Sequence, residues 1–180
     1  NLIIGLLDYS KVSGSRKKLG LVNLEKLIHN IKGNLSTTIH QTNTTIHVAT
    51  LPKVFGNSTQ LMQLFQNMIA NAIKFRKKDA LSIVSISVEI KKDFAIFSIQ
   101  DNGIGIAKSD CGKVFQLFTK LHTREEYRGS GIGLALCKRI VEQHKGHIDI
   151  TSTLGVGTCI SFSLPLHKKA AFLASYKNPV

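Results

Sequence analysis

The chain has 180 residues, of which 43% are hydrophobic, and its 24 Lys and Arg against 11 Asp and Glu give a formal net charge of +13. A chain of this length can bury roughly 70% of its unfolded surface, and its apolar content excludes a disordered tail or a fibrous protein. Its apolar runs are far shorter than the roughly 20 residues that cross a bilayer, and we expect that its first residues are not a signal peptide. We therefore expect one soluble globular domain.

The positive charge first suggests a nucleic-acid partner, but its distribution argues against one. Lys and Arg occur in scattered groups such as 16–18 and 76–78, without the aromatic side chains on which bases stack. Several solvated faces and a preference for small phosphate-bearing ligands explain the charge better. The cysteines, Cys111, Cys137 and Cys159, form no CxxC pair, so we expect reduced thiols in a cytoplasmic protein rather than zinc ligands or disulfides.

The first half of the chain predicts three helices and two short strands. Apolar residues at helical spacing occur before the break at 13–15, and again from Asn23, a good N-cap residue, to the mid-thirties. Asn57 or Ser58 caps a third, longer helix that reaches about Phe75. The predicted strands are 44–49 and 52–55.

The second half predicts four strands, one helix and a long irregular segment. Asp93 lies in a short turn between the first two strands, which therefore form an antiparallel hairpin. A polar, glycine-punctuated stretch from about 107 to 131 precedes a helix over 132–144, with Gly146 as its C′ residue. Helices and antiparallel strands occur without strict βαβ alternation, so we expect an α+β layered sandwich. The predicted strands are 82–90, 94–99, 147–152 and 158–164.

The helix after Asn57 carries one stripe of polar side chains at steps of three and four residues. Its members, which share one face of the helix, are Gln60, Gln63, Asn67, Asn71 and Lys74. An ordinary amphipathic helix with its polar face in water would carry the same pattern, but uncharged amides are unusual on a solvated face of a lysine-rich chain. Amide oxygens suit Mg²⁺, and a lysine one turn along suits phosphate.

Asp101 ends a hydrophobic strand and is followed directly by Asn102-Gly103-Ile104-Gly105. At an isolated position this pattern would be only the turn that closes a strand. A carboxylate that only accepts hydrogen bonds, beside glycines without side chains, can also receive the exocyclic amine of adenine while the backbone lies against the ring.

Two further glycine clusters follow this aspartate. Gly129-Ser130-Gly131-Ile132-Gly133-Leu134 opens the last predicted helix, where exposed backbone amides form an anion-binding nest. It matches neither the Rossmann fingerprint nor the P-loop. Gly155-Val156-Gly157-Thr158 lies between the closing strands, and two interpretations of it stay open: a simple hairpin turn, or a backbone approach near the phosphates.

In their order along the chain, these motifs closely resemble the catalytic, ATP-binding domain of sensor histidine kinases, in the superfamily shared with gyrase, Hsp90 and MutL. The order is an amide-bearing helix, Asp-Asn-Gly-x-Gly, a Phe-rich segment, a Gly-x-Gly-x-Gly-Leu helix start and a Gly-x-Gly-Thr hairpin. The resemblance covers roughly residues 20–166. It implies a Bergerat fold, a two-layer α/β sandwich in which a mixed, largely antiparallel sheet packs against about three helices, with an ATP lid loop.

The resemblance implies a role for each matching residue. The stretch 67–75 looks like the N-box, in which Asn71 would coordinate Mg²⁺ and Lys74 would contact a phosphate. Asn67 would stand where related ATPases carry a water-activating Glu, and an amide there suits a kinase because it does not activate water and waste ATP. Asp101 would bind adenine. The other implied nucleotide contacts are Gly103, Gly105, Phe118, Gly129, Gly131, Gly133, Leu134 and Thr158.

Phe115-Gln116-Leu117-Phe118 resembles the F-box, and the stretch from there to Gly131 resembles the mobile ATP lid. Within it, 120–127 looks like the lids of phytochrome-type and PAS-linked kinases in particular. Lys120, Arg124 and Arg128 lie four residues apart in it. If this piece is helical, they share a face that would meet the γ-phosphate, with Lys120 and Arg128 as the catalytic contributors. Solvated lid charges are the alternative, above all for Arg124.

One part of the family pattern is missing. The acceptor histidine is normally followed by an acidic residue, whereas His29, His40 and His144 are not, and we expect these to be surface or packing histidines. The first residues are similar to the tail of the second dimerisation helix, so we expect a fragment whose acceptor lies upstream. The expected divisions are 1–14 for the end of the dimerisation and phosphoacceptor helices, 15–166 for the catalytic domain and 167–180 for a C-terminal tail.

We therefore predict an ATP-dependent protein-histidine kinase domain that transfers the γ-phosphate of Mg²⁺-ATP to an upstream histidine. Its expected partners are its own phosphoacceptor helices, in cis or in trans, a response regulator and, in the full-length protein, a second copy. Nucleic acid is not expected, and a membrane only through upstream regions, so the full-length protein would be cytoplasmic or membrane-anchored. The alternative is a degenerate nucleotide-binding or protein-interaction module of the same fold without kinase activity.

Overall fold

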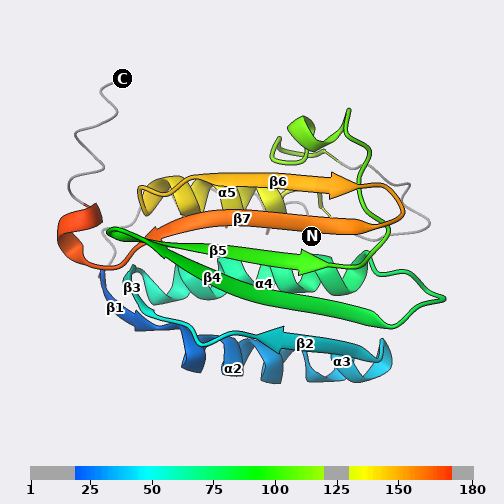
Figure 1. Cartoon of the computed structure of the whole chain (residues 1–180), viewed down its shortest axis with the longest axis horizontal. Helices are drawn as coiled ribbons and strands as arrows, with labels where there is room; N and C mark the ends of the chain where they lie inside the picture. Colours follow the sequence, from blue (N-terminus) through cyan, green and yellow to red (C-terminus); the bar gives the residue numbers. More distant parts are fainter. Residues whose placement is uncertain (1–18, 120–129, 172–180) are drawn as a thin grey trace.

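The computed structural model describes residues 19–119 and 130–171, which form two layers (Figure 1). The larger sheet has five strands in the order β2-β4-β5-β7-β6. The pair β2–β4 is parallel and the other neighbours are antiparallel. The sheet is therefore mixed and largely antiparallel, as the sequence predicts. Its strands are β2 (Thr44–Val48), β4 (Ser82–Lys91), β5 (Phe94–Asp101), β6 (Ile148–Thr153) and β7 (Gly157–Pro165).

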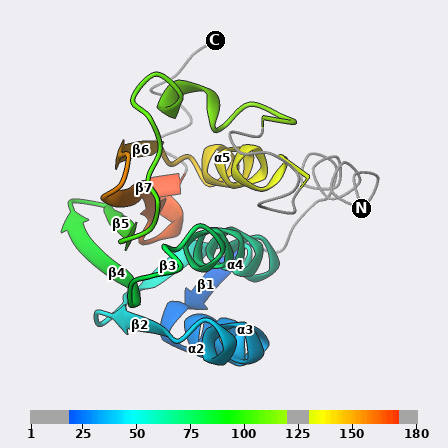
Figure 2. The ribbon, with the colours of Figure 1, turned by 90° about the vertical axis from the view of Figure 1, so that its right-hand side faces the viewer.

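Three main helices cover one face of this sheet. The end-on view in Figure 2 shows them in one layer opposite the strands, with α4 between the other two. The prediction of an α+β sandwich with about three helices is thus confirmed. In the described part of the chain, no helix combines the length and the apolar character needed to span a bilayer. The main helices are α2 (Leu24–Asn34), α4 (Ser58–Lys74) and α5 (Gly133–Gln143), and the short ones are α3 (Ser36–Gln41) and η1 (Cys111–Lys113).

The core between the layers is centred on three phenylalanine rings. Phe65 of α4 meets Phe97 of β5 and Phe162 of β7 edge to face, at 5.6 and 5.3 Å between ring centroids. The rings of Phe97 and Phe162 stack at 5.4 Å, and all three side chains are fully buried. These contacts fix α4 over the middle of the sheet, so that its C-terminal half lies beside the end of β5 that carries Asp101.

Two short elements were not predicted. β1 (Gly20–Asn23) pairs antiparallel with β3 (Lys53–Gly56) in a separate two-stranded sheet. β1 buries only Val22, and four residues are too few to display the period of two that marks a strand. The helix α3 buries no side chain, so no apolar period reveals it.

The predicted N-caps are confirmed, but the predicted end of α5 is not. The left-handed residue after this helix is Lys145, at φ +60°, not Gly146. Gly146 is required for a different reason, because a Cβ there would overlap the carbonyl oxygen of Ser163 in β7. The absence of a side chain therefore lets the chain leave α5 in close contact with the sheet.

The N-terminus of α4 is held by two groups. The Asn57 side chain accepts a hydrogen bond from the Gln60 N–H at 3.0 Å. The backbone N–H of Asn57 donates to Nε2 of His144, also at 3.0 Å. His144 is 4% exposed and its Nδ1 lies 2.8 Å from the Ile140 carbonyl oxygen, so of the two roles expected for it, surface or packing, it has the packing one.

We expect Asn57→Ala to lower the free energy of unfolding by about 1 kcal/mol. The substitution removes the acceptor of the Gln60 N–H and leaves the backbone bond to His144 in place. Asn57→Ser keeps a capping oxygen and is the matched control. Urea unfolding of the two variants measures the difference, and equal stability would contradict the capping role.

Candidate functional site

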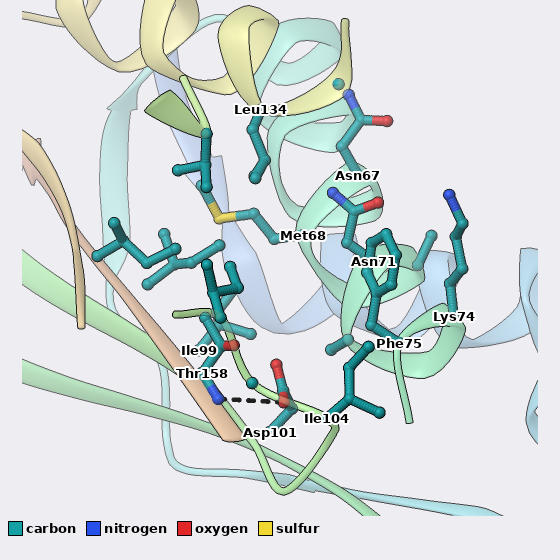
Figure 3. A pocket seen from close by; sticks show the side chains of 18 of the residues that line it. Asn67, Met68, Asn71, Lys74, Phe75, Ile99, Asp101, Ile104, Leu134 and Thr158 are labelled. Atoms are coloured by element: carbon teal, nitrogen blue, oxygen red, sulfur yellow. Dashed lines mark hydrogen bonds between the residues drawn. The ribbon is translucent and has the colours of Figure 1, made fainter. Parts of the chain in front are cut away.

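A cavity of about 340 Å³ opens between α4, the end of β5, β7 and the start of α5. Figure 3 shows Asn67, Asn71 and Lys74 extending from α4 on one side, with Asp101 and Thr158 across from them. Residues from four of the five predicted motifs thus meet in one space, the exception being the Phe-rich segment 115–118. The predicted site residues that line it are Asn67, Asn71, Lys74, Asp101, Gly105, Gly131, Gly133, Leu134 and Thr158.

Asp101 is fixed by two backbone hydrogen bonds to one of its oxygens. Its Oδ1 accepts from the N–H of Gly103 at 2.8 Å and from the N–H of Thr158 at 3.2 Å. In Figure 3 its other oxygen points into the cavity. Burial raises the pKa of Asp101 above the ordinary carboxyl value, and the two hydrogen bonds offset only part of this rise. The cavity therefore has one oriented hydrogen-bond acceptor at this end.

The turn between β6 and β7 lies directly against the loop that follows Asp101. The Gly155 N–H donates to the Ile104 carbonyl oxygen at 2.7 Å. A Cβ at Gly105, whose φ is +70°, would overlap the Thr153 carbonyl oxygen, and a Cβ at Gly157 would overlap that of Asp101. The segment forms the hairpin turn between β6 and β7, and its close backbone approach is to the Asp101 loop.

The polar stripe of α4 divides between two environments. Asn67, Asn71 and Lys74 line the cavity. Gln60 is 4% exposed and donates from Nε2 to Oε1 of Gln143 in α5 at 2.7 Å. The stripe is therefore not a solvated face: its N-terminal end joins α4 to α5, and its C-terminal end faces the cavity.

The first residue of α5 lies beside the two asparagines. A Cβ at Gly133 would be 3.9 Å from Nδ2 of Asn71 and 4.0 Å from Cγ of Asn67. The helix has no acidic side chain in its first turn. Lys74, on the same side of the cavity, places its Nζ 4.5 Å from the centroid of the Phe75 ring. A helix N-terminus and a lysine together make this end of the cavity favourable for an anion.

The apolar walls of the cavity were not predicted. Ile99 and Ile160 are cross-strand partners, two residues from Asp101 and Thr158 respectively. The period of two along a strand could have placed both under the site. The unpredicted lining residues are Met68, Ala70, Ala72, Phe75, Ile99, Ile104, Ile106, Val114, Thr119, Ser130, Ile150 and Ile160.

Two described residues of the predicted site do not line the cavity. Gly103 is buried, holds Asp101 through its N–H, and has no room for a Cβ beside the Phe75 carbonyl oxygen. Phe118 is 54% exposed at φ +64°, and its N–H donates to the Gly131 carbonyl oxygen at 2.9 Å. That bond ties the segment before the predicted lid to the start of α5 while the ring faces outward. Lys120, Arg124, Arg128 and Gly129 lie outside the described residues.

Comparison with known proteins agrees with this geometry. Residues 56–168 match the family described as histidine kinase-, DNA gyrase B-, and HSP90-like ATPase. The chain is 46% identical over 165 residues to cyanobacterial phytochrome A of Nostoc sp. strain PCC 7120. It is 39% identical over 165 residues to the phytochrome-like protein Cph1 of Synechocystis sp. strain PCC 6803. Each alignment covers 92% of this chain but only 21% and 22% of the relatives, so the chain spans about a fifth of their length.

Solved structures share the fold. Full-length ShkA in complex with AMPPNP superimposes with a TM-score of 0.76 and 25% identity, over 91% of this chain and 35% of that chain. The catalytic domain of the histidine kinase ThkA gives a TM-score of 0.71 and 23% identity, over 83% of this chain and 96% of that chain. With the motif residues converging on one cavity and more than half of the sequence matched, the chain belongs to the histidine kinase-, DNA gyrase B- and HSP90-like ATPase family.

Proposed function

We propose that this chain is the catalytic domain of a sensor histidine kinase, which binds ATP with Mg²⁺ and transfers the γ-phosphate to a histidine on helices upstream. The observation that carries the proposal is the polarity of the cavity: a half-buried acceptor, Asp101, lies at one end, and two amides with a lysine lie at the other. The two relatives named above are phytochromes, and the ShkA structure holds AMPPNP, an ATP analogue.

The Asp101 end suits adenine. Ile99, Ile104 and Ile160 line the cavity around it and offer apolar surface to a flat ring. The carboxylate oxygen that points into the cavity accepts a hydrogen bond, and the exocyclic amine of adenine donates one. The two backbone N–H bonds on Oδ1 hold the carboxylate in this orientation before the base arrives.

The Lys74 end suits phosphates and their metal ion. Lys74 and the start of α5 supply positive charge. Among the described residues no group of three His, Cys, Asp or Glu side chains is placed to hold a metal, so a complete protein cage for Mg²⁺ does not exist there. This agrees with the way Mg²⁺ binds nucleotides, through phosphate oxygens, water and few protein ligands. Asn71, whose amide lines the cavity, is the side chain that would hold it.

Asn67 favours phosphoryl transfer over hydrolysis. Of the described residues that line the cavity, Asp101 is the one carboxylate, and it lies at the opposite end from Lys74 (Figure 3). An amide at Asn67 cannot take a proton from water, so none of the described lining residues at the Lys74 end is a carboxylate that could act as a general base. Positioning and charge neutralisation then suffice for transfer to an imidazole.

The wider assignments belong to the same proposal. The acceptor would lie on the protein's own upstream helices, in cis or in trans, with a response regulator as the next recipient and a homodimer as the full-length assembly. The lid residues Lys120 and Arg128 would meet the γ-phosphate, and the full-length protein would be cytoplasmic or membrane-anchored. The divisions 1–14, 15–166 and 167–180 stay predictions.

Titration with ATP, with Mg²⁺ and then with EDTA, tests the proposal. We expect ATP to bind more tightly with Mg²⁺ than without it, and we expect Asn71→Ala to lose most of this gain in affinity. The loss should be about tenfold, because the Asn71 side chain would contact the charged metal ion. Gln63→Ala, on the same stripe of α4 but outside the cavity lining, is the control and should keep the gain. A wild-type chain that binds no adenine nucleotide would overturn the proposal.

Transfer is tested with γ-labelled ATP. We expect the chain to bind the nucleotide without retaining stable label, and to label a phosphoacceptor helix hairpin supplied in trans. Label fixed on the chain itself would contradict an upstream acceptor. Binding without transfer to any hairpin would favour the degenerate module.

A further inference from the structure

Ser152 does not line the cavity, but it is hydrogen-bonded to a residue that does. It faces Thr158 as its cross-strand partner in the β6–β7 pair, and the two hydroxyl oxygens are 2.9 Å apart. Ser152 Oγ also lies 2.8 Å from the Ile106 backbone nitrogen and 2.8 Å from the Gly157 carbonyl oxygen. One serine hydroxyl thus joins three segments behind the Asp101 end of the cavity.

The direction of each bond follows from counting protons. A serine hydroxyl has one hydrogen and two lone pairs. The Gly157 carbonyl oxygen can only accept, so the Ser152 hydrogen goes to it. The Ile106 N–H can only donate, so it occupies one lone pair of Ser152. The remaining lone pair faces Thr158, and the hydrogen in that contact must therefore come from the Thr158 hydroxyl.

Thr158 consequently presents lone pairs, not a hydrogen, to the cavity that it lines. Its backbone N–H is already donated to Oδ1 of Asp101. The hydroxyl of Thr158 and the cavity-facing oxygen of Asp101 are then neighbouring acceptors at the same end of the cavity (Figure 3). If the ligand also presented an acceptor there, neither the ligand group nor the protein acceptors would have a hydrogen-bond partner. Unpaired polar groups in a cavity lower the binding free energy more than a missing hydrogen bond at the surface does.

We propose that Ser152 is a specificity-determining positioning residue: by fixing Thr158 as an acceptor, it makes the cavity prefer a purine with an amino group at carbon 6 over a purine with an oxo group there. Adenine carries the amino donor, whereas guanine and hypoxanthine carry a carbonyl acceptor at that atom. The inference rests on the proposed function, because it concerns the base of the same nucleotide. It adds a residue that acts through Thr158 without touching the ligand.

The test compares the affinities of ATP and of inosine triphosphate, which differs from ATP by the oxo group and the ring proton that comes with it. In Ser152→Ala the Thr158 hydroxyl loses its acceptor and is free to turn its hydrogen toward the base. We expect the preference for ATP over inosine triphosphate to fall by about fivefold, the effect of reversing one hydrogen bond. Ser152→Thr keeps a hydroxyl and should retain the preference.

Two further variants separate specificity from packing. Ser161→Ala is the matched control: Ser161 also lies on β7 and bonds a neighbouring strand, with Ser98 Oγ at 3.1 Å, but it faces the opposite side of the sheet from Ile160 and Phe162. It should leave the preference unchanged. In a Thr158→Val background, Ser152→Ala should no longer alter the preference, because the hydroxyl it acts through is gone.

A purely structural role for Ser152 gives a different result. If Ser152→Ala weakens both nucleotides equally, or still changes the preference in the Thr158→Val background, the inference is wrong while the proposed function stands. If the wild-type chain binds neither nucleotide, the proposed function fails and the inference fails with it.

Discussion

Asp101→Asn is expected to weaken ATP binding about 100-fold without weakening the fold. The amide oxygen of Asn can still accept from the N–H groups of Gly103 and Thr158, which hold Oδ1 in the wild type. The other oxygen, which points into the cavity (Figure 3), becomes an NH₂ group that meets the amine of adenine donor to donor. Losing a hydrogen bond to a charged acceptor and adding an unpaired donor should cost about 100-fold in affinity.

The same variant has an expected signature in stability against pH. Burial raises the pKa of Asp101 above 3.8, the value for an exposed aspartate, so the folded chain holds this proton more tightly than the unfolded chain. The ionisation of Asp101 therefore lowers the free energy of unfolding as the pH rises from near the pKa of the unfolded chain through the raised pKa of the folded chain. Asn does not titrate, so the Tm of the variant relative to wild type should increase across that window and then level off.

Isothermal titration with ATP and thermal unfolding over a pH series measure the two effects. The control is Asp149→Asn, a substitution of an exposed aspartate on β6, which should leave ATP binding unchanged. A variant of Asp101 that binds ATP as wild type does would refute the adenine contact. A variant that is less stable than wild type at neutral pH would refute the burial explanation.

Local sequence signals predicted most of the fold. The caps at Asn23 and Asn57 were visible because a single amide side chain satisfies the first helical N–H groups. The strands of the large sheet were visible because one face of each is apolar. β1 and α3 were not predicted because β1 buries one residue and α3 buries none. An element that buries so few side chains shows no periodic pattern of apolar residues in the sequence.

The candidate site was predicted as motifs, but its geometry depends on strand order. Asp101 and Thr158 are 57 residues apart, and they meet because β5 is the neighbour of β7. Motif spacing within one sequence does not give that order. It also does not separate Gln60, which binds Gln143, from Asn67 and Asn71 on the same stripe. The difference arises from how α5 crosses α4, which is a property of the packed core.

Phe65→Ala is expected to have the largest effect on stability. The side chain is fully buried and contacts the rings of Phe97 and Phe162, which come from two adjacent strands. Truncation leaves a cavity where α4 packs on the middle of the sheet. Phe→Ala changes in cores cost about 3–5 kcal/mol, a large part of the roughly 5–15 kcal/mol that stabilises a domain.

Urea unfolding measures this loss, with Ile90→Ala as the control, since Ile90 is a strand residue of β4 that is 53% exposed and should lose far less. Phe65→Leu, which fills most of the space, should fall between Phe65→Ala and wild type. Because a ligand that binds only the folded state adds stability by mass action, Mg²⁺-ATP should recover part of the loss in Phe65→Ala if α4 keeps its place. Equal losses for Phe65→Ala and Ile90→Ala would show that the aromatic cluster does not hold α4 against the sheet, and the arrangement of the site would then need another cause.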